Sequence, residues 1–517
     1  MRLEKSLDNS AGRARRAERF SACAFVLALA LAAGAVSVPV RGAGQSSGQG
    51  LPDVRRETVM AQAQEQLKRG DAAGAARILS IWAKAHPADA AARLMLASVL
   101  ARLHRYPEAA AAVAGVPAPA PLRERIGYER LKASIDLGLG NAKAAARDME
   151  QALTLAPEDA GLALATGMAE SEAGAWPEAA THLQQAIEGL PGDSPGRADL
   201  YYDLALAEFN AGQLDAALAA AEHAKRLADG AALESLMGDI QEARGSNVAA
   251  AHSYQAAVTL APDQEQYRLT LGLELLRHET FEPALAVFKQ TAELFPRSRR
   301  ARVAEGLTYY FLEQYPQAIQ ALLEAARLNS PVSPASKGST PELALDYLGE
   351  IQLQQPVTPD PAAIEQICRY ADSHSRGAGA AELAYCGALE LRLEHDRGDA
   401  APSRATVARL RQAVQRMPSN ATARCSLGQA LEWTHEWWPA EREMEACLRL
   451  KPDSVEGHYR MANIARHLGQ SERAQQELKL HDAAQQRLVQ SNAARDSTLK
   501  KFLYTMGGSA AKDSTQP

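Results

Sequence analysis

A repeat of about 34 residues runs through most of this 517-residue chain and limits its possible folds more than any other feature. Five of the eleven spacings between successive repeat starts are 34 residues. We place the starts at Arg56, Ala90, Ile126, Ala160, Ala198, Ala231, Glu265, Arg299, Glu342, Ala380, Ala421 and Val455. The eighth residue of every repeat is small: Ala63, Ala97, Ala133, Gly167, Ala205, Gly238, Gly272, Gly306, Gly349, Gly387, Gly428 and Ala462. Such agreement exceeds what composition alone predicts.

Each regularity has a physical cause in a pair of antiparallel helices. A small residue at position eight, with Ala at position twenty in ten repeats, lets two helices cross at short distance. Gly near position fifteen, as in Gly70 and Gly140, supplies a left-handed residue that ends the first helix. Pro closes seven repeats because it cannot continue the hydrogen-bond ladder of the second helix. An excess of Ala over aromatic residues also favours helices over strands, and we predict an all-α fold.

The pattern resembles the tetratricopeptide repeat (TPR) family. The shared features are the small residue at eight, Ala at twenty, Pro at thirty-two, and Tyr or Trp at seventeen, as in Tyr106, Trp176, Tyr315 and Trp437. The resemblance covers residues 56–488 and implies an α-solenoid, a right-handed superhelix of about twelve helix-turn-helix units. It implies a concave groove lined by first helices, and binding of a protein partner instead of catalysis.

The first 43 residues have the layout of an export signal. Basic residues precede an uncharged apolar run over 21–40, and Arg41 ends that run. The run is about long enough to span a bilayer, so cleavage as a signal peptide and retention as a signal anchor both remain open. We expect a periplasmic or secreted protein, anchored to the inner membrane only if residues 21–40 are retained. Residues 44–55 are predicted to be a linker.

Interruptions of the repeat predict the domain boundaries. An N-terminal array spans 56–328, a Ser/Pro-rich hinge follows at 329–341, and a C-terminal array with a capping helix spans 342–490. Residues 491–517 are predicted to be a helix end and a disordered tail.

Most classes of chemistry lack support in the sequence. With 62 acidic against 56 basic residues and a net charge of −6, the chain has no basic excess for binding nucleic acid. It contains no Gly-rich phosphate loop and no protease or hydrolase motif. The solenoid leaves no second domain for an active site. We therefore predict a protein that is not an enzyme, with no cofactor and no metal site.

Four cysteines lie in the C-terminal array: Cys368, Cys386, Cys425 and Cys447. An even number of cysteines in an oxidising compartment favours pairing. Cys425 and Cys447 fall at positions five and twenty-seven of one repeat, level with each other across its helix pair, and Cys368 would then pair with Cys386. The alternative is four buried free thiols that act as small hydrophobic residues.

The groove carries the main functional prediction. Positions five, nine, twelve and thirteen of a first helix face the groove, where apolar residues favour a bound helix or peptide. The candidate partner-binding residues are Tyr202, Leu206 and Phe209 in the fifth repeat, Leu269, Leu273 and Leu276 in the seventh, and Val303, Leu307, Tyr310 and Phe311 in the eighth. The alternative is that curvature buries these residues against neighbouring repeats.

We therefore predict a non-enzymatic protein–protein interaction scaffold of the bacterial cell envelope, which binds a partner peptide or helix in an apolar concave groove. A second hypothesis is a TPR accessory subunit of an envelope polysaccharide or secretion enzyme complex. The sequence does not identify the partner, the pathway or the oligomeric state.

Overall fold

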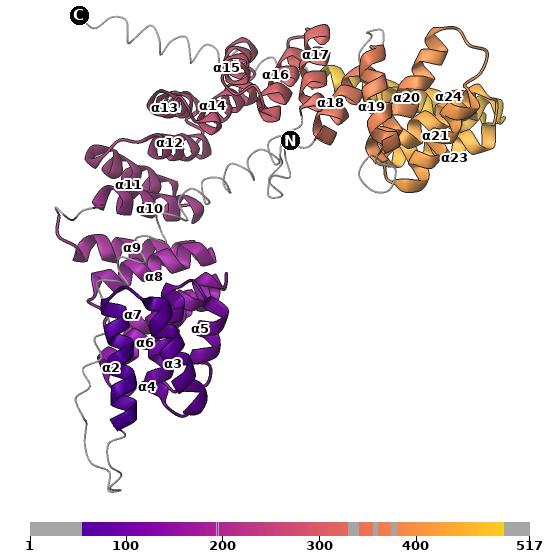
Figure 1. Ribbon diagram of the computed structural model, residues 1–517. Coiled ribbons are helices and arrows are strands. Elements are labelled where there is room, and N and C mark those ends of the chain that lie inside the picture. Colours follow the sequence, from indigo (N-terminus) through magenta and orange to yellow (C-terminus); the bar gives the residue numbers. More distant parts are fainter. Residues whose placement is uncertain are drawn as a thin grey trace, which may run out of the picture. The chain divides into compact units, whose positions relative to one another are not determined.

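The computed structural model describes residues 54–192, 194, 196–328, 341–354, 360–373 and 380–490, and every regular element in these ranges is a helix (Figure 1). The helices are α2 (Val54–Lys68), α3 (Ala72–Ala85), α4 (Ala90–Arg102), α5 (Tyr106–Val113), α6 (Leu122–Gly138), α7 (Ala142–Leu155), α8 (Ala160–Ala173), α9 (Trp176–Gly189), α10 (Arg197–Asn210), α11 (Leu214–Leu227), α12 (Ala231–Ala243), α13 (Asn247–Leu260), α14 (Glu265–Arg277), α15 (Phe281–Leu294), α16 (Arg299–Phe311), α17 (Tyr315–Arg327), α18 (Pro341–Gln354), α19 (Pro361–Ser373), α20 (Ala380–Asp396), α21 (Arg404–Arg416), α22 (Ala421–Trp433), α23 (Trp437–Leu450) and α24 (Val455–His467). The chain is also helical over 471–490. The all-α solenoid prediction is confirmed.

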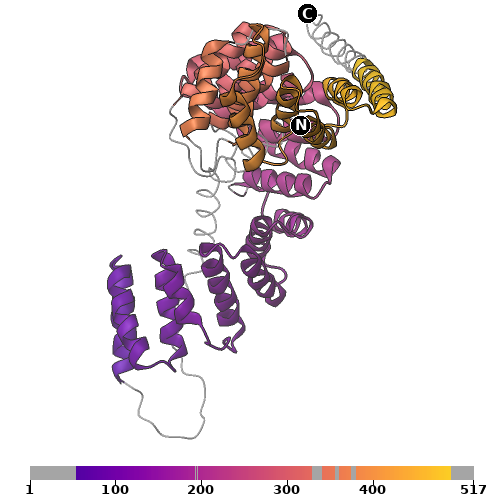
Figure 2. The same ribbon diagram turned by 90° about the vertical axis from the view of Figure 1, so that its right-hand side faces the viewer.

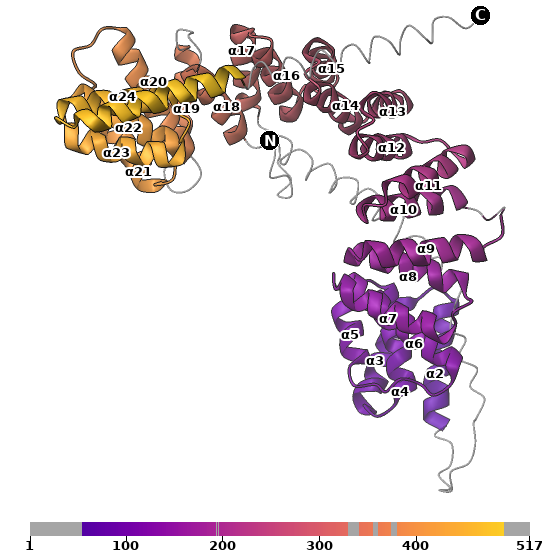
Figure 3. The ribbon, with the colours of Figure 1, turned by 180° about the vertical axis from the view of Figure 1, so that it is seen from behind.

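Two compact bodies divide this solenoid, with the boundary between Ser253 and Tyr254 inside α13. We call residues 54–253 the N-terminal body and residues 254–490 the C-terminal body. Within each body a helix packs on its neighbours in sequence, and first helices of adjacent repeats also touch, as α4 touches α6 and α20 touches α22. The separate helix pairs are visible in the N-terminal body in Figure 2 and in the C-terminal body in Figure 3.

The small residue at position eight lies where the two helices of a repeat cross. A Cβ atom added to Gly272 would lie 2.4 Å from the Phe288 ring, and one added to Gly167 would lie 2.8 Å from Leu183 Cγ. Both contacted side chains stand at position twenty-four of the repeat and are fully buried. Larger side chains would force the helix pair apart, which explains the invariance seen in the sequence.

The N-cap residue of a first helix ties adjacent repeats together. Asp89 caps α4 by accepting from the Ala92 N–H at 3.1 Å. It also accepts from Arg56 Nε at 2.8 Å and from Trp82 Nε1 at 2.9 Å, two residues of the preceding repeat. In the C-terminal body Ser298 caps α16 through the Ala301 N–H, and its hydroxyl donates to Glu265 Oε1 at 2.5 Å. The same two repeat positions thus interact across a separation of 33 residues in both bodies.

A left-handed residue ends the first helix of most repeats, as predicted. Gly70 has a φ of 82° and Gly140 a φ of 79°. Four repeats carry another residue there with the same backbone conformation: His104, Glu279, Glu313 and His435, at φ between 54° and 62°. Because a Cβ disfavours this region, the repeat geometry imposes the turn on these four positions.

Several sequence predictions fall outside the described residues, among them the leader over 1–43, the hinge up to its last residue, Pro341, and the tail over 491–517. These boundaries remain predictions. Among the residues that are described, no helix combines the length and the apolar character that crossing a membrane requires.

Candidate functional site

The fifth-repeat part of the predicted groove lies within the hydrophobic core of the N-terminal body. Tyr202 on α10 is buried, and Leu206 and Phe209 are partly buried and pack against the same core. Close packing against neighbouring helices, the alternative given by the sequence, accounts for these three positions.

The seventh- and eighth-repeat residues divide between core and surface in the C-terminal body. Leu269, Val303 and Leu307 are buried, which again follows the packing alternative. The remaining four stay accessible to different degrees: Leu273, Leu276 and Tyr310 are partly buried, and Phe311 is 41% exposed. An aromatic at position thirteen is thus the most accessible of the ten predicted residues.

Phe311 belongs to a continuous group of rings. It stacks on Phe281 of α15, with ring centroids 5.3 Å apart and planes at 9°. Tyr310 packs edge-on against Phe311 at 5.6 Å and lies 6.0 Å from the Tyr315 ring. We call Phe281, Tyr310, Phe311 and Tyr315 the aromatic patch. Stacked rings on three successive helices provide a rigid apolar surface at low entropic cost for a partner.

Carboxylates stand beside the aromatic patch. Glu282 follows Phe281 directly and is exposed, and the exposed Glu313 lies between Phe311 and Tyr315. Tyr315 is affected by this neighbourhood: burial, the Glu313 charge and Tyr310 raise the pKa of its hydroxyl. Arg277, the nearest arginine in sequence, is held by Glu274 at 3.0 Å. The patch therefore combines an apolar centre with an acidic margin, which favours a basic partner.

The stacking of Phe281 on Phe311 is one case of a contact between repeats. Position seventeen of one repeat packs on position thirteen of the next, and Trp437 stacks in the same way on His467, with centroids 4.0 Å apart. Tyr106 lies against Gly138, where an added Cβ would be 2.4 Å from its ring. The aromatic at position seventeen thus joins neighbouring repeats. Trp438, one residue further along, is 66% exposed.

Position eleven of the first helix carries a polar side chain in the fourth, fifth and sixth repeats. In the fourth repeat Glu170 Oε2 forms a hydrogen bond of 2.7 Å with His182 Nδ1. In the sixth repeat Ser253 Oγ donates to Gln241 Oε1 at 2.9 Å. In the fifth repeat the position equivalent to His182 is Ala220, and Glu208 Oε2 is buried with no hydrogen-bond partner among the described residues. Burial raises the pKa of Glu208 to about 7.

Two disulfides join the four C-terminal cysteines. Cys425 and Cys447 are bonded at 2.04 Å between α22 and α23, the two helices of one repeat. Cys368 and Cys386 are bonded at 2.03 Å between α19 and α20, which belong to adjacent repeats. The first pair therefore staples a single repeat, and the second staples two repeats together. Whether both bonds form in the cell stays a prediction.

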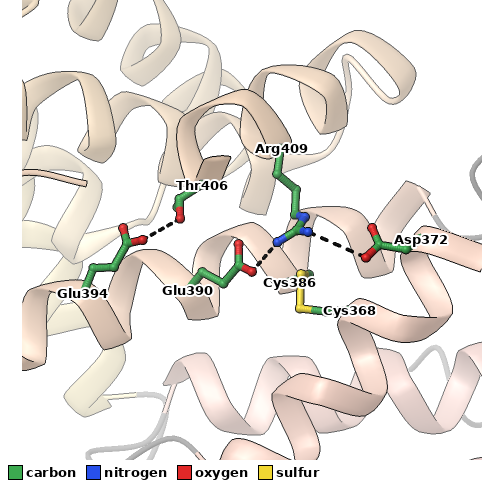
Figure 4. The surroundings of a disulfide bond; sticks show 7 residues. All are labelled: Cys368, Asp372, Cys386, Glu390, Glu394, Thr406 and Arg409. Carbon is green, nitrogen blue, oxygen red and sulfur yellow. Dashed lines mark hydrogen bonds and ion pairs between the residues drawn. A yellow bond between two sulfur atoms is a disulfide. The ribbon is translucent and has the colours of Figure 1, made fainter. Parts of the chain in front are cut away.

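Charged groups surround the bond between repeats (Figure 4). Arg409 of α21 lies between the carboxylates of Glu390 and Asp372, pairing with Glu390 and lying 3.7 Å from Asp372. Both sulfurs and one Glu390 oxygen lie within 4.8 Å of one another. This is a set of metal-ligand types, but each sulfur is bonded to the other and neither is a free thiolate. The arrangement thus joins α19, α20 and α21 through one covalent bond and one arginine.

The family model of the tetratricopeptide repeat matches residues 60–123, 130–194 and 269–334. These matches fall in both bodies and coincide with the helix pairs and inter-repeat contacts described above. The chain is a tetratricopeptide repeat protein. Its repeats indicate a protein–protein interaction scaffold.

Several solved structures are similar to this chain at low identity. The Cut9–Hcn1 hetero-tetramer of the APC/C is 15% identical, with 86% of this chain and 89% of that chain covered, at a TM-score of 0.35. YrrB, described as a TPR protein with an unusual peptide-binding site, is 21% identical, with 37% and 96% covered, at 0.29. MamA from Desulfovibrio magneticus is 20% identical, with 33% and 95% covered, at 0.30. A search of the curated proteins found no match.

Sequence reasoning missed Glu282 and Glu313 beside the patch, the Glu208 carboxylate oxygen without a partner among the described residues, and the stacking between positions seventeen and thirteen. A signal for the last two was present in the repeat alignment. Ala220 stands where the fourth repeat has His182, and aromatic residues recur at positions seventeen and thirteen of successive repeats. Comparing equivalent positions in pairs would have found them.

Proposed function

We propose that this tetratricopeptide repeat protein is a non-enzymatic scaffold of the bacterial cell envelope that holds a basic, amphipathic partner segment on its aromatic patch. The observation that carries the proposal is Phe311. It is a large aromatic side chain that stays exposed on a rigid stack of rings while comparable groove residues are buried. Exposed aromatic anchors with rigid support are typical of binding hot spots.

The chemistry of the partner follows from the margin of the patch. Glu282 and Glu313 are exposed and form no salt bridge within the described chain, so a partner with Lys or Arg beside an apolar face gains two attractive contacts. A neutral or acidic segment with the same apolar face lacks this gain. Binding should therefore weaken as salt concentration rises.

The envelope location rests on two features. The sequence begins with a basic segment followed by an apolar run over 21–40, as export signals do. The two cysteine pairs lie at bonding distance, and structural disulfides persist in oxidising compartments. Fractionation of cells that make the full chain, with N-terminal sequencing, tests both the location and the cleavage of the leader. Recovery in the cytoplasm with an intact leader and free thiols would contradict this part of the proposal.

The binding experiment uses two synthetic helical peptides with the same Leu/Phe face, one flanked by Lys and Arg and one by Glu. Fluorescence anisotropy should show that the basic peptide binds the full chain, and that Phe311→Asp weakens binding by about tenfold or more. Ile81→Asp is the matched control, because Ile81 is an exposed apolar residue, 73% exposed, on α3 of the N-terminal body. Equal affinity for the two peptides, or an equal loss in both variants, would reject the aromatic patch as the binding site.

A further inference from the structure

The start of α16 concentrates positive charge in a chain that is acidic overall. Arg297, Arg299, Arg300 and Arg302 lie within six residues, against a net charge of −6 for the whole protein. Two of the four have clear structural tasks. Arg299 donates from Nε to the Ala325 carbonyl at the end of α17, at 3.1 Å, and Arg302 pairs with Glu305 at 2.8 Å. Packing and ion pairs within the described chain do not account for Arg297 and Arg300 in the same way.

Arg297 and Arg300 face a recess at the junction of the seventh and eighth repeats. The cavity has a volume of about 550 Å³ and lies entirely within the C-terminal body. Its lining consists of Glu265, Leu294, Phe295, Pro296, Arg297, Ser298, Arg299 and Arg300. Three guanidinium groups and one carboxylate give the recess an excess of positive charge.

Arg300 lacks a full set of partners in this recess. Its Nη2 donates to Gln266 Oε1 at 2.8 Å, whereas its Nε is buried and has no acceptor among the described residues. No carboxylate in the described chain lies within 4.0 Å of Arg300. Burial lowers the pKa of its guanidinium, and the Glu265 charge only partly opposes this. A buried donor without an acceptor is unfavourable, and a bound anion would satisfy it.

At the junction of the first and second repeats, an arginine of the equivalent recess is bound by a carboxylate of the same chain. A cavity lies at the same place there, lined by Arg56, Trp82 and Asp89 among others. At that junction the N-cap is Asp89, whose carboxylate accepts from Arg56 Nε at 2.8 Å and from Nη2 at 3.1 Å. At the seventh junction the N-cap is Ser298, which carries no charge. The arginine-rich junction therefore lacks the N-cap carboxylate of the first junction, and its one carboxylate, Glu265, accepts from Ser298.

We propose that the recess at the start of α16 binds an oxyanion, a carboxylate or a phosphate, through Arg297 and Arg300, with an apolar part of the ligand against Leu294. Leu294 is 53% exposed at the wall of the same recess and offers that contact. The exposed Arg297 supplies long-range attraction and Arg300 supplies a directed donor. This site is separate from the aromatic patch and does not depend on the proposed function.

Three probes distinguish the possible sources of the oxyanion. Isothermal titration of the full chain compares inorganic phosphate, N-acetyl-leucine, which has a carboxylate and an apolar side chain, and N-acetyl-leucinamide, which lacks the charge. We expect N-acetyl-leucine to bind at least tenfold more tightly than the amide. Tighter binding of phosphate than of N-acetyl-leucine would identify a phosphate ligand, and the reverse order would identify a peptide or organic carboxylate. Failure of both anions to bind at about 10 mM would overturn the proposal.

Two substitutions connect the binding to Arg300. Arg300→Gln should lower the affinity for the anion at least tenfold. Gln266→Glu should do the same without loss of the guanidinium, because it places a carboxylate on the group that already accepts from Arg300. Arg226→Gln, which removes an exposed charge from the end of α11, is the control and should leave binding unchanged. Circular dichroism checks that each variant is folded. Anion binding that survives both substitutions in folded protein would assign it to another place and reject the site.

Discussion

The two bodies of this tetratricopeptide repeat protein hold their repeats together in different ways. In the N-terminal body the described ties between repeats are noncovalent, as where Arg56 and Trp82 of one repeat meet Asp89 at the start of the next. In the C-terminal body the bond between Cys368 and Cys386 joins two repeats covalently. The repeats joined by this bond are also irregular in spacing, with starts 38 and 41 residues apart in place of 34.

This difference teaches how a repeat protein tolerates irregular repeats. A regular array obtains its stability from many similar contacts between neighbours, so a departure from the pattern weakens one junction. Longer turns, such as the segment from Arg397 to Ser403, also raise the entropy of the unfolded chain. A cross-link reduces the entropy of that unfolded state and compensates for the weaker junction.

The largest expected effect comes from the two disulfides. They close segments of 18 and 22 residues, for which the chain-entropy model gives about 3 kcal/mol each. Replacing Cys368 and Cys386 together by Ser should lower the free energy of unfolding of the C-terminal body by that amount and increase hydrogen exchange in both α19 and α20. The Cys425→Ser and Cys447→Ser pair should instead increase exchange within α22 and α23.

Hydrogen exchange measured by mass spectrometry on the full chain separates these outcomes, and exchange in α2 to α11 serves as the internal control. Identical exchange in wild type and both paired variants would mean that the cross-links are not needed for the stability of these repeats.

An intermediate effect is expected at Asp89, the noncovalent counterpart of the cross-link. Burial alone would raise the pKa of this carboxyl, but hydrogen bonds from Arg56, Trp82 and the Ala92 amide lower it to about 2. Because its folded pKa lies below its unfolded value of 3.8, the stabilisation is present above pH 4 and is lost as pH falls toward 2. Asp89→Ala should cost about 2 kcal/mol at neutral pH, from the lost cap and the lost charged hydrogen bonds.

Urea unfolding followed by tryptophan fluorescence at pH 7, 4 and 2 measures this effect. Asp71→Ala is the matched control: Asp71 also caps a helix through the Gly74 N–H, but among the described residues its side chain forms no hydrogen bond or ion pair with another repeat. An equal cost for the two variants would show that the tie between repeats adds nothing to the cap.

The smallest effect is expected at Glu208, within the N-terminal body. Its folded pKa of about 7 lies above the unfolded value of 4.5, so folding takes up a proton between these pH values and stability falls as pH rises from 4.5 to 7. Glu208→Gln should therefore stabilise the protein by about 1 kcal/mol at pH 8, a value reduced for solvent screening of a partly buried group. Near pH 4 the change should have little effect.

The comparison with Glu170→Gln sharpens this test, because Glu170 occupies the same repeat position and has His182 as its partner. Burial raises the pKa of Glu170 as well, but the substitution also alters its hydrogen bond with His182, so it should stabilise the protein less than Glu208→Gln at pH 8. Thermal unfolding of both variants at pH 4 and 8 measures the two changes, and equal stabilisation by both, or stabilisation by neither, would show that the missing partner is not the cause.

Much of the fold was predictable from residues with local or repeated roles. Gly272 at position eight and Gly70 at position fifteen mark a helix crossing and a helix end, and both tasks depend on the absence of a side chain. Position counting also placed Cys425 level with Cys447, because two antiparallel helices bring positions five and twenty-seven together. The candidate site was less predictable. Tyr202 and Phe311 both stand at groove positions, yet one is buried and the other is exposed.

The sequence by itself determined the helix pairs, their turns and their order, because these depend on contacts that recur with a fixed period along the chain. Only the tertiary structure decided which side chains are covered by the next repeat and which charges remain unpaired. It left Phe311 accessible and buried the Arg300 Nε without an acceptor among the described residues. These outcomes depend on residues of neighbouring helices that meet only after folding, so no single repeat contains the information that sets them.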